Sequence, residues 1–326
     1  MRLAIFRGMI KTRTPFFQNA PGRNEKDVRA VCKLAVHNNG SMHMVPIISG
    51  NTIRAKIRTG IALDILEKLG PGSLDYATLS FITCGGALKT RSKKEGEREK
   101  KIAEVIEALE RLTRGNPVAS LFGGSTPQRI ISGKTITPHA VLVCKEAEPL
   151  LPREYYTEES ANKYISTEGL RHTRFDRIKT REVFQYLDGE EARELKVKAN
   201  KEEDQTSLQM VWGIDEYITN GASFYQQIEI EEPTSIEIGA IYSALERFAK
   251  NPVIGSFVSK GFGRVAMEYH LILAEAAANE KKDVDIISVT KDGNCKYKDS
   301  MGFYKEYKQW LGHVKAQDIV IPDTLR

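Results

Sequence analysis

Residues 223–273 read SFYQQIEIEEPTSIEIGAIYSALERFAKNPVIGSFVSKGFGRVAMEYHLIL. The first ten of these residues alternate apolar and polar side chains, as a half-buried strand does. Thr234 and Glu237 follow at capping-box spacing and open a helix whose apolar residues recur every three or four positions. Asn251-Pro252 ends this helix, and a glycine-rich loop (255–265) leads directly into a second alternating strand. The stretch therefore predicts a strand–helix–loop–strand unit.

The N-terminal part of the chain contains a second helical pattern between short apolar runs. Ser49 and Asn51 are both suitable N-cap residues for this helix, and Gly70-Pro71-Gly72 ends it. The patterns predict a strand at 3–10, a mostly irregular region at 12–45 with a strand or short helix at 28–37, a helix at 53–69 and a strand at 76–82.

The middle of the chain combines regular patterns with charged insertions. A second amphipathic helix is predicted at 102–112 and a strand around 136–145. Residues 150–215, in which charged side chains dominate 187–204, are interpreted as an extended insertion that stands off the core. The succession of elements predicts an α+β fold with an antiparallel sheet of the split-βαβ, ferredoxin-like type.

Composition sets broad limits on function. The chain has 326 residues, which corresponds to about two domains or one elaborated domain. Hydrophobic residues make up 41% and charged residues 28%, so wholesale disorder is excluded. Lysine and arginine number 48 against 43 aspartate and glutamate residues, for a net charge of +5. This mild excess permits a polyanionic partner without demonstrating one.

The sequence offers no signal for a membrane or an oxidising compartment. No run of about 18 apolar residues exists, and the N-terminus lacks the apolar centre of a signal peptide. The four cysteines (Cys32, Cys84, Cys144 and Cys295) are far apart and form no CxxC pair. We therefore expect a cytoplasmic protein with free thiols, no membrane partner and no cofactor.

A first candidate site is the stretch IISGNTIRAKIRTG (47–60). Arg54 and Arg58 lie four residues apart near a glycine-flanked helix start, where free N–H groups and the helix dipole favour an anion. A phosphodiester backbone would fit there, but no nucleotide-triphosphate loop motif is present. An ordinary capped helix with solvated basic residues is the alternative.

A second candidate site is the glycine-rich loop at 255–265. Lys260 and Arg264 supply positive charge, and Phe262 could stack on a base. The loop precedes a strand, so it is not a dinucleotide-binding fingerprint. A tight structural turn is the alternative.

The third candidate is the basic stretch RHTRFDRIKTR (171–181) within the insertion. Arg171, Arg174 and Arg177 recur at three-residue spacing around Phe175, a composition that suits single-stranded nucleic acid. A solvated face is the alternative. The charge run at 89–101 has mixed signs and is interpreted as solvated.

Catalytic patterns are weak. The six histidines form no HExxH or HxH motif. His37 and His43 could serve acid–base cleavage of RNA, and Asp27 could act as a general base or metal ligand. Incidental loop histidines and a surface ion pair of Asp27 are the alternatives.

Three motifs, PIISGNTIRAKIR (46–58), LFGGS (121–125) and SKGFGRV (259–265), together resemble the RAMP superfamily of CRISPR-associated proteins. Their order is most similar to the backbone-subunit branch, often called the Cas-seven family, and within it to the type IV effector backbone subunit. The resemblance covers about residues 1–275.

This resemblance implies an RRM-like palm at 1–275. The palm would carry a helical insertion at 88–115 and a projecting β-hairpin thumb within 155–215. Residues 276–326 are expected to be a C-terminal extension that packs on the core or on a neighbour.

The resemblance also implies a function. The chain would bind a guide RNA without sequence specificity and stack with copies of itself into a helical filament, beside other CRISPR effector subunits and with a target nucleic acid as a further partner. By motif, Ser49, Asn51, Arg54 and Arg58 would approach the RNA backbone, with Lys260, Phe262 and Arg264 beside it. Asp27 lies near the position of a cleaving aspartate in type III relatives, but the GGxD-like pattern around it is missing. We therefore expect a non-enzymatic subunit, with an endoribonuclease as the alternative.

Overall fold

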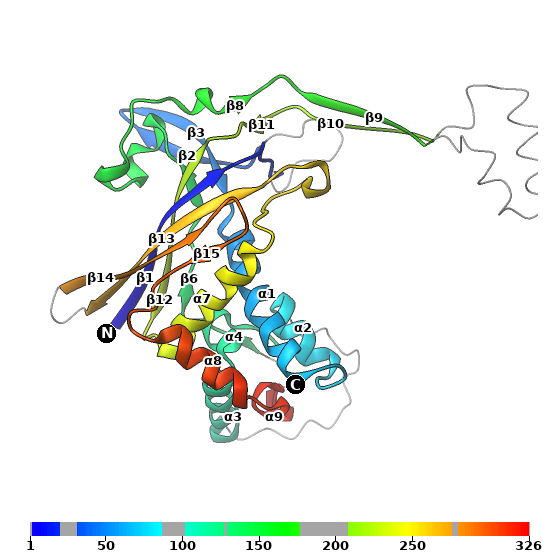
Figure 1. Ribbon diagram of the computed structural model, residues 1–326, viewed down its shortest axis with the longest axis vertical. Helices are drawn as coiled ribbons and strands as arrows, with labels where there is room; N and C mark the ends of the chain where they lie inside the picture. Colours follow the sequence, from blue (N-terminus) through cyan, green and yellow to red (C-terminus); the bar gives the residue numbers. More distant parts are fainter. Residues whose placement is uncertain are drawn as a thin grey trace, which may run out of the picture.

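The computed structural model describes residues 2–19, 31–86, 102–126, 129–176, 208–275 and 280–325. It confirms the predicted α+β class: helices pack on an antiparallel nine-stranded sheet (Figure 1). The sheet runs in the order β15-β14-β13-β1-β12-β7-β3-β2, with β6 also paired to β12.

The centre of the sheet has the split-βαβ arrangement. The core elements in chain order are β1 (Arg2–Thr12), α1 (Gly50–Leu69), β6 (Thr135–Ile136) with β7 (Ala140–Leu142), β12 (Ser223–Glu231), α7 (Ser235–Ala249) and β13 (Val265–Glu275). The two short strands β6 and β7 both pair with β12 and together stand in for one core strand. The four strand positions therefore lie in the spatial order 4-1-3-2, all antiparallel, as in a ferredoxin-like fold.

The stretch at 223–273 folds as its pattern predicts. Residues of β12 alternate between buried and half-buried side chains, and Phe224, Ile228 and Ile230 are fully buried. Thr234 caps α7: its Oγ1 accepts from the N–H of Glu237 (3.2 Å), and the Glu237 carboxylate accepts from the N–H of Thr234 (2.8 Å). Both halves of the capping box are thus present, which fixes the point at which the chain leaves the sheet.

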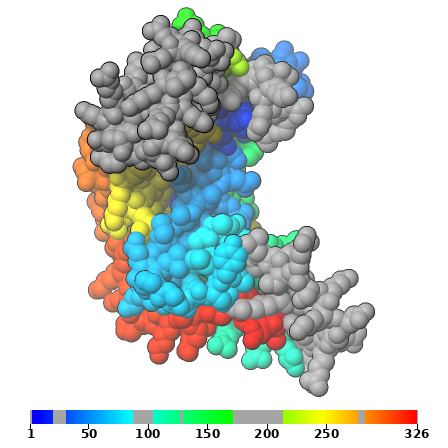
Figure 2. Space-filling view, turned by 90° about the vertical axis from the view of Figure 1, so that its right-hand side faces the viewer, coloured from blue at the N-terminus to red at the C-terminus, as the bar shows by residue number. Residues whose placement is uncertain are grey.

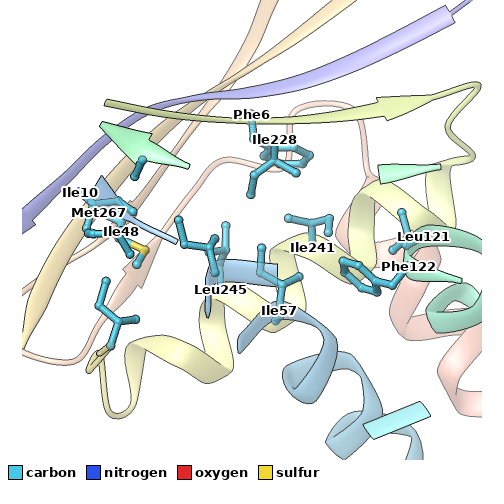
Figure 3. Close-up of a cluster of buried hydrophobic side chains, with 14 of the residues drawn as sticks. Phe6, Ile10, Ile48, Ile57, Leu121, Phe122, Ile228, Ile241, Leu245 and Met267 are labelled. Atoms are coloured by element: carbon cyan, nitrogen blue, oxygen red, sulfur yellow. The ribbon is translucent and has the colours of Figure 1, made fainter. Parts of the chain in front are cut away.

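The hydrophobic core lies between the sheet and the helices α1 and α7. Phe6 and Ile10 of β1 and Ile228 of β12 face Ile57 of α1 and Ile241 of α7 (Figure 3). Gly60 lets α1 approach α7 closely, since a Cβ there would lie 3.0 Å from Ala244. In Figure 2, α1 and α2 (blue to cyan) face the viewer above the C-terminal residues in red.

Two sequence predictions in the N-terminal part are wrong. The region 12–45 was predicted to be mostly irregular, with a strand or short helix at 28–37. It contains a hairpin of β2 (Lys33–Asn38) and β3 (Ser41–Ile48), so the strand alternative is right for residues 33–37 and the irregular remainder is wrong for β3. Its turn is Asn39-Gly40, with both residues at positive φ (49° and 79°), the geometry that Asn-Gly pairs favour in hairpins. Residues 76–82, predicted as a strand, belong to the helix α2 (Tyr76–Cys84).

The helix α2 forms because both of its ends are capped. The Asp75 carboxylate accepts from the backbone N–H of Thr78 (3.0 Å) and from its hydroxyl (2.9 Å). Gly85 ends the helix in the left-handed conformation (φ 81°). These local bonds outweigh the β-propensity of the intervening aromatic and β-branched residues.

The remaining elements lie outside the ferredoxin-like core. The predicted helix at 102–112 is α3 (Ile102–Gly115), followed by α4 (Pro117–Phe122). Short elements follow: β4 (Gly124–Ser125), β5 (Ile130–Ile131), and the 3-10 turns η1 (Lys145–Leu150), η2 (Arg153–Tyr155), η3 (Ala161–Lys163), η4 (Val258–Lys260) and η5 (Asp323–Leu325). The charge run at 89–101, which was interpreted as solvated, lies outside the described residues.

A β-ribbon extends from one end of the sheet (Figure 1). It consists of β8 (Ile165–Ser166) paired with β11 (Tyr217–Ile218) and of β9 (Leu170–Asp176) paired with β10 (Leu208–Ile214). This antiparallel ribbon corresponds to the projecting hairpin of the predicted fold.

The C-terminal residues join both layers of the fold. β14 (Glu280–Val289) extends the sheet beside β13, and β15 (Cys295–Lys296) pairs with β14. α8 (Phe303–His313) packs on α7, and α9 (Ala316–Ile319) lies against α3.

A buried carboxylate joins three helices. Asp64 of α1 accepts hydrogen bonds from the Ser243 hydroxyl (2.5 Å) and the Arg247 guanidinium (2.8 and 3.0 Å) of α7, and from the Tyr307 hydroxyl (3.3 Å) of α8. Burial, and then the charge of Asp64, raises the pKa of Tyr307. This network fixes α8 as a structural part of the helical layer.

Candidate nucleic-acid interface

The start of α1 is held by side chains from two other segments. Ser49 is the N-cap residue, but its hydroxyl makes no capping bond. Instead, Gln18 accepts from the N–H of Ser49 (3.1 Å) and donates to the Thr52 hydroxyl (3.0 Å), while the Nδ1 of His139 accepts from the N–H of Gly50 (3.0 Å). The first turn carries no acidic residue, so the positive end of the helix dipole is not neutralised there.

The two arginines of the first motif have different environments. Arg54 is half-buried and donates to the carbonyl of Phe122. Arg58 is only 6% exposed, and its guanidinium donates to the carbonyls of Phe81 (3.3 Å), Phe122 (3.1 Å) and Gly123 (2.9 Å). Arg58 therefore holds protein backbone in this structure and presents no guanidinium edge to a surface ligand.

This arrangement joins the first motif to the second, LFGGS. The guanidinium carbons of Arg54 and Arg58 lie 5.8 and 5.4 Å from the centre of the Phe122 ring. Gly123 has φ 58°, and a Cβ on it would lie 2.0 Å from the carbonyl oxygen of Ile131. The glycine is thus required by a close approach of two loops beside the arginines.

The third motif forms a tight loop before β13. Gly263 has φ 82°, and a Cβ there would lie 1.9 Å from the carbonyl oxygen of Ile254. Phe262 is 6% exposed and packs edge-on against Tyr217 and Phe257, with ring centres 6.1 and 6.4 Å away. The structure thus gives the Phe262 ring a core contact and leaves no face of it for stacking on a base. Lys260 and Arg264 are exposed.

Residues 13–18 connect the glycine-rich loop to the start of α1. The N–H groups of Arg13 and Gly263 donate to the carbonyls of Arg264 and Pro15 (both 2.8 Å), and that of Ser256 donates to Phe17 (2.7 Å). Gln18 then bonds to Ser49 and Thr52. The first and third motifs therefore flank one short segment.

The same segment anchors the β-ribbon. Phe16 and Ile218 of β11 exchange backbone hydrogen bonds of 2.8 and 2.9 Å. Arg171 and Arg174 belong to β9 by backbone position, whereas their side chains, and all of Arg177, lie outside what the structure describes. Residues 13–18 thus bring together the start of α1, the glycine-rich loop and the base of the ribbon (Figure 1).

Sequence reasoning missed three residues of this surface. Exposed Arg13 lies beside Arg264 through the backbone bond just described, and Gln18 and His139 hold the start of α1. The position of Arg13, a basic residue directly after the predicted first strand, was the one sequence signal that could have placed it in this surface. Neither Gln18 nor His139 carries a local pattern, because each acts on a segment distant in sequence.

A cleft opens beside Arg54, between α1 and the residues around 124–133. The exposed thiol of Cys84 lies on its wall. Burial raises the pKa of Cys32, and it raises the pKa values of Cys144 and Cys295 to about 12.

We predict that Cys84 is the fast-reacting thiol of the native protein. A thiol reagent at mildly alkaline pH needs an accessible thiolate, which burial denies to the other three cysteines. Titration with a chromogenic disulfide should give one fast equivalent, which Cys84→Ser removes. If two or more equivalents react at the fast rate, a second thiol is accessible, which would contradict the assignment of Cys84 as the fast-reacting thiol.

The histidines proposed for cleavage do not form a pair. His37 lies opposite Met42 and is exposed, while His43 lies opposite Val36. Because neighbouring residues of a strand point to opposite faces, the two imidazoles lie on different sides of the hairpin. Asp27 lies outside the described residues. In the described part of the chain, no group of three or more His, Cys, Asp or Glu side chains is placed to hold a metal ion.

Comparison with known proteins gives one kind of match. No protein-family model matches the sequence, and no curated protein matches it. Among solved structures, the fold is similar to that of a chain described as "Type IV-B CRISPR Complex", with a TM-score of 0.47 and 16% sequence identity, covering 86% of this chain and 93% of that chain. A likeness of this size assigns no function to the present chain. Over the described ranges, no helix is both long enough and apolar enough to cross a bilayer.

Proposed function

We propose that the chain is a non-enzymatic RNA-binding subunit of a CRISPR effector complex. It holds the phosphate backbone of a guide RNA without reading the base sequence. Copies of the chain assemble along the guide into a helical filament, beside other subunits of the complex and with access to a target nucleic acid.

One observation carries this proposal: motifs far apart in sequence converge on the segment of residues 13–18. The convergence brings the positive end of α1, the exposed Arg13 and Arg264, and the glycine-rich loop with Lys260 around this one segment. Arginine and lysine side chains bind phosphate, and the dipole of α1, which no acidic residue neutralises in the first turn, adds a favourable field.

The chemistry of this surface favours backbone binding over base reading. Phe262, the aromatic ring expected to stack on a base, is buried. Cationic groups on exposed loops neutralise phosphates without regard to sequence, so binding should be sequence-independent and steeply salt-dependent.

The motif resemblance supplies the assembly and the type IV assignment. The β-ribbon anchored on Phe16 extends away from the sheet, where it could reach a neighbouring copy on the same RNA. This geometry supports a filament and leaves the number of copies open.

The endoribonuclease alternative rests on Asp27, or on His37 or His43 acting singly, since the two histidines lie on opposite faces of their hairpin. Incubating labelled RNA with the protein, with and without Mg²⁺, separates the two functions. Defined products that disappear in Asp27→Ala or in His43→Ala would establish the enzyme. Intact RNA under both conditions supports the binding subunit.

The direct test of binding is a titration of labelled single-stranded RNAs of unrelated sequence over a range of salt concentrations. We expect similar dissociation constants for all of the RNAs and a linear fall of log affinity with log salt, with a slope of about −0.7 per phosphate contacted. A strong preference for one sequence, or an affinity that salt leaves unchanged, would contradict phosphate-backbone binding.

A further inference from the structure

The β-ribbon has a break near its base. The lower ladder pairs β8 with β11 over only two positions. The longer ladder of β9 and β10 begins further along the ribbon, with Ile214 opposite Leu170. Residues 167–169 and 215–216 lie between the two ladders and belong to neither. A two-stranded ribbon has little stability of its own, so the contacts made at this break decide the direction in which the ribbon extends.

Glu216 lies in the break and bonds to another part of the fold. Its carboxylate accepts from the ammonium group of Lys33, the first residue of β2, and from the backbone N–H of Val31 (3.1 Å). The side chains of Glu216 and Lys33 are only 13% and 23% exposed, so solvent screens this ion pair weakly. Glu216 therefore ties the break to the segment that leads into β2.

The next two residues of the ribbon are tied to two further segments. The ring of Tyr217 packs edge-on against Phe262 of the glycine-rich loop, with ring centres 6.1 Å apart. Ile218, which exchanges backbone hydrogen bonds with Phe16, is fully buried. Ile214, on the far side of the break, is fully buried as well. The base of the ribbon thus contacts three segments that are distant in sequence, which restrains it in more than one direction.

The contact with Tyr217 also accounts for the burial of Phe262. Phe262 lies between Lys260 and Arg264, the two exposed cations of the glycine-rich loop. Its ring faces Tyr217 in the interior, while the cations on either side reach the surface. One loop therefore presents positive charge to solvent and holds the base of the ribbon.

From these contacts we propose that Glu216 and Tyr217 are positioning residues, which fix the direction of the β-ribbon so that it meets a neighbouring copy of this chain. A segment that is ordered in advance loses little conformational entropy when it docks, so more of its contact energy appears as affinity. The inference rests on the proposed function, because the neighbouring copy is the next one along the RNA.

The direction of the ribbon is tested without RNA, on the full-length, nuclease-treated protein. Spin labels are attached to the exposed thiol of Cys84 and to Thr173→Cys in β9, and pulsed electron–electron double resonance measures the distribution of distances between them. We expect a narrow distribution for the wild type and for Glu216→Gln with Tyr217→Phe, which retain the acceptor and the ring. Glu216→Ala with Tyr217→Ser should broaden the distribution.

Assembly is then measured with two RNAs. The first is the shortest oligonucleotide that the protein binds, which holds one copy, and the second is several times longer. We expect both double variants to bind the short RNA within about twofold of the wild type, because the exposed cations are unchanged. On the long RNA, Glu216→Ala with Tyr217→Ser should lose about tenfold in apparent affinity, a usual size for coupling between sites. Glu216→Gln with Tyr217→Phe should retain the wild-type affinity.

Several results would overturn the inference. One is a broad distance distribution in the wild type, and another is a distribution that Glu216→Ala with Tyr217→Ser leaves narrow. A third is an unchanged affinity of this variant for the long RNA. An equal loss of affinity for both RNAs would make the two residues supports of the glycine-rich loop instead.

Two further outcomes are separated by the design. If Glu216→Ala with Tyr217→Ser does not fold, Glu216→Ala alone takes its place in both measurements, since Tyr217 then still packs on Phe262. If the wild type binds neither RNA, the proposed function fails, and the distance distributions still decide whether Glu216 and Tyr217 fix the ribbon.

Discussion

Replacing Arg58 by alanine is expected to lower the free energy of unfolding by about 3–5 kcal/mol. The guanidinium of Arg58 donates to three carbonyls, those of Phe81, Phe122 and Gly123, and is nearly inaccessible to solvent. Alanine would remove the Arg58 donor from the carbonyl of Gly123 and one of two donors from the carbonyls of Phe81 and Phe122, and it would open a void beside the Phe122 ring. Denaturant unfolding followed by circular dichroism measures the loss.

Arg54→Ala is the matched control for Arg58→Ala. Arg54 is half-buried and makes one of these carbonyl bonds, so its removal should cost about 1 kcal/mol. Arg58→Lys should fall between the two, since an ammonium cannot reach all three carbonyls in the same geometry. An Arg58→Ala protein as stable as wild type would refute the structural role of this side chain.

Reversing the charges of Arg13 and Arg264 should have the largest effect on RNA affinity. We expect Arg13→Glu with Arg264→Glu to weaken binding by about a hundredfold at low salt and to make the salt dependence shallower by about 1.4 in slope. Both side chains are exposed, and their backbones are joined by a 2.8 Å hydrogen bond, so the variant should fold normally. Fluorescence anisotropy with single-stranded RNA measures both quantities.

A variant with the same change of net charge elsewhere provides the control. Arg114 of α3 and Lys305 of α8 are exposed and lie on other elements. If Arg114→Glu with Lys305→Glu weakens binding as much as the first pair, only overall charge matters, and the surface around residues 13–18 has no special role.

Elements with strong local patterns were predictable from the sequence. The alternation in β12 and β13 and the Thr234–Glu237 capping box define strand and helix through neighbouring residues alone. The split-βαβ order followed because few arrangements place two such units in one antiparallel sheet.

Both segments that were assigned wrongly carry local signals of the structure that they adopt. Asn39-Gly40 is a strong hairpin signal, and Asp75 with Thr78 is an N-cap pattern. The sequence YATLSFI satisfies strand propensity equally well, so the capping residues on its flanks, and not its composition, decided its structure.

The spacing of residues in the sequence could not show which of the candidate RNA-binding side chains are buried in the fold. Arg58 shares a helix face with Arg54, but the carbonyls of Phe81 and Phe122 that enclose it come from other segments. Phe262 is buried for the same reason, through Tyr217 and Phe257. Conversely, Gln18 and His139 gain their roles only when the fold brings them to the start of α1.

The central claim, that this chain holds RNA, is tested most directly by the ultraviolet absorbance of the purified protein before and after nuclease treatment. The account predicts a nucleic-acid contribution that RNase removes and DNase does not, with large particles dissociating as the RNA is digested. The account would be contradicted by a purified protein that contains no RNA, forms no large particles and also fails to bind added single-stranded RNA at low salt.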